Sequence, residues 1–159
     1  MQTHLVSAPR LEFFRLEFGE NLNVALEDHL KHSGFGSLWL YGLQAQVHSV
    51  TLGFWDTNKQ AYDREKIQPL GHSRIEPGAI SGNVTWVDGK PFAHIHGAFF
   101  SAEFSEQGKL LGGGHICELI AGRTLEGFIA VSDTHIERVL DKNPNCMVKT
   151  WRFPGESMM

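Results

Sequence analysis

Apolar and polar residues alternate along most of this 159-residue chain, a pattern typical of β-strands, whose side chains point to opposite faces in turn. Glycine, proline and short polar runs separate the alternating segments. The segment 61–69 is interpreted as a strand edge and loop, and 134–140 is ambiguous between a strand and a short helix. We predict strands over residues 11–18, 37–47, 49–56, 74–83, 83–87, 91–103, 116–120, 124–131 and 147–153.

One segment has the periodicity of a helix instead. Within Asn21–His32, leucines recur every four residues and form one apolar face, at Leu22, Leu26 and Leu30. Gly34 follows at a position where a helix ends. We therefore predict one main helix.

Turn residues indicate how the strands connect. Asp88-Gly89 is the clearest signal for a two-residue hairpin turn, and Pro77-Gly78 predicts a bulge or bend within a strand. No repeat, linker or low-complexity tract divides the chain. The prediction is an α+β fold, with a largely antiparallel β-sheet packed with one main helix in a single compact domain. That domain covers residues 1–159, with its core at about 10–153.

Composition narrows the function classes. The chain has 14 Lys and Arg against 18 Asp and Glu, a net charge of −4, which disfavours a protein whose main role is to coat DNA. Cys117 and Cys146 are too few for a disulfide framework, which favours a reducing compartment. No signal peptide is evident, nor an apolar run of the roughly 20 residues that cross a bilayer. We expect a cytoplasmic protein without a membrane partner.

Three histidines carry the clearest chemistry. His94 and His96 are two residues apart on a predicted strand and so project from one face, while Ala93 and Ile95 take the other. His115 follows three glycines, where the backbone can approach a neighbouring strand closely. Three neutral imidazoles with an open fourth position are typical of a site for zinc or a similar divalent metal. The alternative is a set of polar residues on a solvated face, and we favour the metal site.

Further residues could complete such a site. On a regular strand Cys117 shares the face of His115, so its thiolate could close the metal shell, although packing as a small buried residue is favoured. Glu118 is a candidate general base or a partner for an imidazole N–H, but on a regular strand it faces away from His115. Glu76 and Glu103 are the other candidate bases.

These motifs, taken in order, resemble the plant and prokaryote conserved (PPC) domain. The resemblance covers nearly the whole chain and departs from the family at Cys117, where an aliphatic residue is usual. It implies a compact α+β fold and a homotrimer, whose interface we expect near the histidine strand. In prokaryotic members it also implies a zinc-like metal held by three histidines, which by position are His94, His96 and His115. The motifs are Arg74-Ile75-Glu76, Ser81-Gly82-Asn83, Asp88-Gly89-Lys90-Pro91, His94-x-His96 and Gly113-Gly114-His115 with Glu118.

The resemblance also bears on partners. Plant members carry an AT-hook that enters the DNA minor groove, and this chain has no such element, so it resembles a stand-alone prokaryotic member. DNA is thus a partner by resemblance only, with little support from charge. Two functions remain open at this stage. One is a metal-containing module that binds a small-molecule ligand or has a regulatory role. The alternative is a zinc-dependent hydrolase or lyase that uses metal-activated water.

Overall fold

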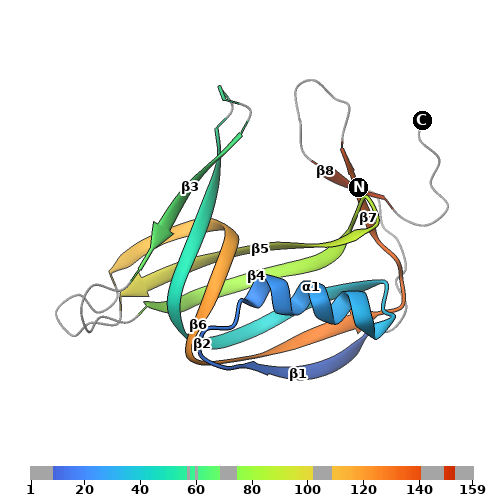
Figure 1. The fold of residues 1–159 in the computed structure, drawn as a ribbon, viewed down its shortest axis with the longest axis horizontal. Coiled ribbons are helices and arrows are strands. Elements are labelled where there is room, and N and C mark those ends of the chain that lie inside the picture. The colour runs from blue at the N-terminus through green and yellow to red at the C-terminus, as the bar shows by residue number, and fades with distance from the viewer. Residues whose placement is uncertain are drawn as a thin grey trace.

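Eight strands and one helix form in the described part of the chain (Figure 1). The computed structural model describes residues 9–56, 58–59, 61–68, 75–101, 109–140 and 149–152. In chain order the elements are β1 (Arg10–Leu16), α1 (Leu22–Ser33), β2 (Ser37–Asp56), β3 (Ala61–Ile67), β4 (Ile75–Val87), β5 (Lys90–Ser101), β6 (Leu110–Ser132), β7 (Glu137–Leu140) and β8 (Lys149–Arg152). Polar runs at 105–108 and 141–145 also predict turns, and both lie outside the described residues.

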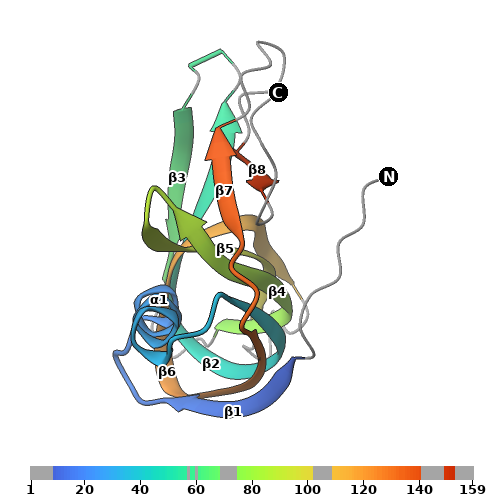
Figure 2. The same cartoon turned by 90° about the vertical axis from the view of Figure 1, so that its right-hand side faces the viewer.

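The strands form one sheet in the order β3-β2-β6-β5-β4-β7-β8, and β1 pairs with β6. β2 also pairs with β4, so β2, β6, β5 and β4 close into a ring (Figure 2). All pairings are antiparallel except the one between β4 and β7. The predicted combination of a largely antiparallel sheet with one helix is confirmed, and strands dominate the fold.

The core lies within this ring and under the helix. The largest fully buried side chains come from every strand of the ring and from α1. They include Leu22 and Leu30 of α1, Leu38 and Leu52 of β2, Ile75 of β4, Ile95 and Phe99 of β5, and Ile116, Leu119 and Leu125 of β6. Burial of these alternating apolar residues is the main stabilisation of the fold.

Three pairs of predicted strands are each one long strand, which corrects the prediction. The segments 37–47 and 49–56 form β2, 74–83 and 83–87 form β4, and 116–120 and 124–131 form β6 together with the glycines before them. β2 and β6 pair along most of their length, with register shifts between Tyr41 and Leu43 and on both sides of Val47. Such bulges bend a strand and keep it paired, so residues that look like a turn in the sequence are absorbed within the strand.

The predictions for the helix ends, the hairpin turn and the bulge in β4 are confirmed. α1 begins after Asn21, whose side-chain oxygen accepts from the N–H groups of Asn23 (3.0 Å) and Val24 (3.4 Å). It ends at Gly34, which has a φ of 79°. Asp88-Gly89 forms the hairpin turn with φ angles of 50° and 73°. A register shift between Pro77 and Ala79 is the predicted bulge in β4. Within the described residues, no helix is long and apolar enough to span a membrane.

Candidate metal centre

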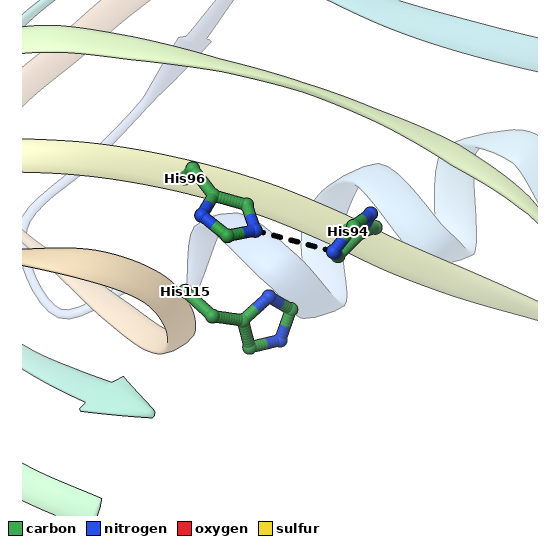
Figure 3. A group of neighbouring side chains, drawn as sticks. All are labelled: His94, His96 and His115. Carbon is green, nitrogen blue, oxygen red and sulfur yellow. Dashed lines mark hydrogen bonds between the residues drawn. The ribbon is translucent and has the colours of Figure 1, made fainter. Parts of the chain in front are cut away.

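The three predicted ligands lie together at one place on the sheet (Figure 3). His94 and His96 come from β5, and His115 of β6 is the register partner of His96. Each ring offers a nitrogen, and these three nitrogens lie within 4.8 Å of one another. The Nε2 atoms of His94 and His96 are 3.2 Å apart. The rings therefore converge on one point.

Strand alternation explains why the rings share a face. Ala93 and Ile95 are buried in the core, at 3% and 0% exposure, whereas His96 is exposed and His94 is half-buried. β5 thus turns its apolar residues inward and its histidines outward, as predicted. Because directly opposite residues of paired strands share a face, pairing with His96 brings His115 to the same side.

α1 inserts two polar side chains where β5 and β6 stop pairing. The ladder between these strands ends at the pair His96–His115. Beyond it, the Glu27 carboxylate accepts the N–H of Ala93 on β5 (2.8 Å), and the Asn23 amide donates to the carbonyl of Ile116 on β6 (3.0 Å). Burial raises the pKa of Glu27, and this hydrogen bond opposes the shift. The helix therefore satisfies one backbone group on each ligand-bearing strand beyond the end of their ladder.

Electrostatics keep two of the rings neutral. Burial lowers the pKa of His94 to about 4, with help from the guanidinium of Arg138 and from the other two rings. The pKa of His115 is also lowered, by burial first and then by His96, Arg138 and Arg64. At neutral pH both rings are therefore uncharged, and the neutral imidazole is the form that binds a metal.

Arg138 and Phe92 flank the histidines. Arg138 of β7 is 5% exposed, and it donates through Nε to Thr85 Oγ1 (3.1 Å) and through Nη2 to Asn83 Oδ1 (3.0 Å). Asn83 is the register partner of His94. The ring of Phe92 lies 6.5 Å from both His94 and His115 and nearly parallel to them, at 24° and 14°. The site thus has an apolar wall and a buried cation.

The donor set fits a zinc-type cation. Zn–N bonds of about 2.1 Å in a tetrahedral shell place ligand nitrogens about 3.4 Å apart. The spacing of 3.2 Å between the Nε2 atoms of His94 and His96 is close to this, and one nitrogen from each of the three rings lies within 4.8 Å of the others. His96 is exposed, so solvent reaches the cluster from its side.

Among the described residues, the candidate ligand group consists of the three histidines. The other candidate residues are not part of it. Thr51 pairs with Glu118 and Leu52 with Ile116, so Cys117 is the extra residue of a bulge. Strict alternation therefore fails here, and Glu118 returns to the face of His115, contrary to the prediction for a regular strand. Glu76 is exposed on β4, opposite Phe100. Glu103 and Arg74 lie outside the described residues.

Sequence reasoning missed three residues that support the site, namely Asn23, Glu27 and Arg138. The first two lie four residues apart, next to the leucine face of α1, and a polar pair bordering an apolar face is a usable signal. Arg138 gave no local signal, because the pairing of β7 with β4 that brings it to Asn83 is long-range.

Comparisons with known proteins give a consistent fold. No protein-family model matches the sequence, and no curated protein is detectably similar to it. The chain is similar to a metal-containing protein from Archaeoglobus fulgidus, at 24% identity and a TM-score of 0.76 over 94% of this chain and 99% of that one. It is similar to a plant- and prokaryote-conserved (PPC) protein from Pyrococcus horikoshii, at 24% identity and a TM-score of 0.73 over 89% and 92%.

A third similar structure is a proposed DNA-binding protein from Ralstonia eutropha JMP134, at 22% identity and a TM-score of 0.74 over 89% of this chain and 90% of that one. At these identities the likeness establishes architecture. The structural similarity covers about nine-tenths or more of each chain, so the whole architecture is shared and not one motif only. The protein has the fold of the PPC proteins.

Proposed function

We propose that this protein binds one zinc-like divalent cation through His94, His96 and His115, and acts as a ligand-binding or regulatory module built around that cation. The observation that carries the proposal is the convergence of three ring nitrogens within 4.8 Å. When bound, such a cation keeps a coordination position for a further ligand. The metal-containing protein from Archaeoglobus fulgidus, which has the same fold, supports the proposal.

The hydrolase or lyase alternative has less support. A general base must lie within hydrogen-bond reach of the group it deprotonates. Among the described residues, the ligand group contains no carboxylate, and Glu118 shares the face of His115 without joining that group. We therefore take binding, and not turnover, as the proposed function.

Metal content and thermal stability test this proposal directly. We expect protein purified without chelator to carry one zinc-like ion per chain, because the three histidines form one site. Removing the ion with a chelator should lower Tm by about 5–10 °C relative to protein with metal at 100 times its Kd. Adding zinc back should restore Tm. Metal-free protein whose Tm does not respond to zinc would refute the proposal.

We also propose self-association, as the family resemblance implies, and we now propose the contact at exposed aromatic residues instead of near the histidine strand. Three exposed aromatic residues form a row across β1, β6 and β2, since Phe13 and Tyr41 are both register partners of Phe128. Their exposures are 59%, 58% and 51%, and the rings of Phe13 and Phe128 are in edge contact at 5.3 Å. Exposed apolar surface of this kind is typical of contacts between subunits.

Light scattering at micromolar concentration tests this. We expect a homotrimer, with three times the 17.8 kDa chain mass. Phe128→Glu places a charge at the centre of the aromatic row and should shift the mass towards that of one chain. Lys31→Glu, on the exposed part of α1, is the control and should leave the mass unchanged. A wild-type monomer, or a trimer that survives Phe128→Glu, would contradict the proposed contact.

Sequence-specific DNA binding by this chain should be weak or absent. The net charge is −4, and the described helix presents Asp28 beside Lys31 on its exposed side, so it has no cationic face for a major groove. We expect any affinity for duplex DNA to fall steeply as salt increases. Fluorescence anisotropy with labelled duplexes at physiological salt measures this, and nanomolar binding to one sequence would show the expectation to be wrong.

A further inference from the structure

Arginines lie on two sides of the histidine cluster. The first is Arg138, which is buried and bonded to Asn83 and Thr85 of β4. These two residues are the register partners of His94 and Phe92 on β5. Because register partners share a face, the Arg138 guanidinium lies on the histidine side of the sheet, next to His94.

The second is Arg64, which approaches from the opposite side. It is the register partner of Gly53 on β2, and Gly53 is the register partner of His115 on β6. The row Arg64–Gly53–His115–His96 thus crosses four adjacent strands on one face. Two strand spacings separate Arg64 from His115, about 10 Å between backbones. Because glycine has no side chain, β2 places nothing between the two residues, and an arginine side chain can span much of this gap.

The pKa of His115 supports this placement. Burial is the main cause of its lowered pKa, followed by His96 and then by Arg138 and Arg64, so both guanidinium groups also act on the ring electrostatically. Arg64 is exposed, whereas Arg138 is buried, so one cation faces solvent at the site and the other lies beneath it.

The charges at the site are unbalanced once a metal is bound. The three imidazoles are neutral donors, so they leave the two positive charges of a divalent cation uncompensated. The exposed guanidinium of Arg64 adds to that charge. Concentrated positive charge on a partly desolvated surface attracts a ligand of the opposite sign. The bound cation and Arg64 therefore form a local cationic site in a chain with a net charge of −4, with Glu118 further along β6 on the same face.

We propose that the open coordination position of the bound cation takes a small carboxylate, which reaches the metal through an oxygen atom, and that Arg64 stabilises its negative charge from the solvent side. This inference rests on the proposed metal binding. The ligand enters beside His96, whose ring is exposed, while Phe92 closes the other side with an apolar ring. Arg138 has a structural role here, since it holds Asn83 opposite His94.

Cobalt substitution gives a readout that does not depend on catalysis. Co²⁺ accepts the same nitrogen donors as zinc, and its visible absorption reports changes in its coordination. The protein is loaded with Co²⁺ at neutral pH and titrated with acetate or with acetamide at constant ionic strength. Acetamide has almost the same shape as acetate and no charge. We expect a saturable spectral change with acetate and none with acetamide.

Two arginine variants test which positive charge attracts the carboxylate. Arg64→Gln should weaken acetate binding by about two- to fivefold, the range for a solvent-exposed ion pair. Arg123→Gln is the matched control. It removes the same charge from an exposed arginine eight residues beyond His115 on β6, and it should leave acetate binding unchanged. Arg64 is chosen over Arg138 because it is exposed and its replacement leaves the fold intact.

The outcomes separate the two proposals. Failure of the wild-type protein to bind Co²⁺ would overturn the proposed metal site itself. A normal Co²⁺ spectrum that acetate does not change, or that acetamide changes equally, would overturn the anion site alone. Equal weakening by Arg64→Gln and Arg123→Gln would show that overall charge and not Arg64 attracts the ligand, and would overturn the role given to Arg64.

Discussion

Replacing His94 by alanine is expected to lower the affinity for zinc more than about 100-fold, since loss of a residue that only supports a ligand already costs 10- to 100-fold. His94 is central to the cluster. Its ring centroid lies 4.9 Å from that of His96 and 5.1 Å from that of His115. Its low pKa of about 4 keeps it neutral, so at neutral pH it contributes a donor without first releasing a proton.

Competition with a chromophoric chelator measures this effect. His48→Ala is the control, because His48 is an exposed strand histidine on β2 whose ring contacts Phe18 and not the cluster. We expect His48→Ala to bind zinc like the wild type and His94→Ala to lose it to the chelator. Circular dichroism of both variants establishes that the fold is kept. Equal zinc affinity in the two variants would remove His94 from the proposed ligand set.

Gly82→Ala is expected to destabilise the fold by about 3 kcal/mol or more, the upper end of the range for overpacked cores. Gly82 on β4 lies between Leu40 on β2 and Ile95 on β5, where the ring closes. A Cβ atom there would lie 2.4 Å from the carbonyl oxygen of His94 and 2.6 Å from the Cα of Ile95. Both are backbone atoms, so relief requires the strands to separate.

Thermal unfolding measures the cost, which corresponds to a decrease in Tm of about 6–12 °C. Ser81→Ala, at the exposed neighbouring position, should change stability by no more than about 0.5 kcal/mol. Because Ile95 lies between the two histidines of β5, Gly82→Ala should also weaken zinc binding. A Gly82→Ala protein with wild-type Tm would show that β4 and β5 are less tightly held than the register indicates.

Local patterns in the sequence predicted the elements that depend on local chemistry. The leucine spacing and the residues Asn21 and Gly34 predicted α1, and Asp88-Gly89 predicted the β4–β5 hairpin. The period of two predicted that His94 and His96 share a face. In each case the signal lies within a few residues, so the local pattern was enough to decide the structure and tertiary contacts did not change it.

Long-range pairing decided the features that the sequence did not predict. β2 and β6 look interrupted in sequence, but their mutual pairing continues through the bulges and makes each one strand. The bulge at Cys117 reversed the expected direction of Glu118 for the same reason, since an extra residue in one strand is defined only by its partner. Arg138 reaches Asn83 from 55 residues away in sequence, a contact that no local period encodes.

The bonds from α1 to β5 and β6 at the end of their ladder have a consequence for how metal preference can evolve. A continuous backbone ladder fixes the spacing of two strands at close to 4.8 Å, whatever the side chains, and this includes the pair His96–His115. Beyond that pair, Glu27 bonds to Ala93, the neighbour of His94, and Asn23 bonds to Ile116, the neighbour of His115. A change of one methylene in the Glu27 side chain can therefore alter the position of His94 relative to the other two ligands. Selection for a cation of larger or smaller radius can act on α1 while all three histidines stay unchanged.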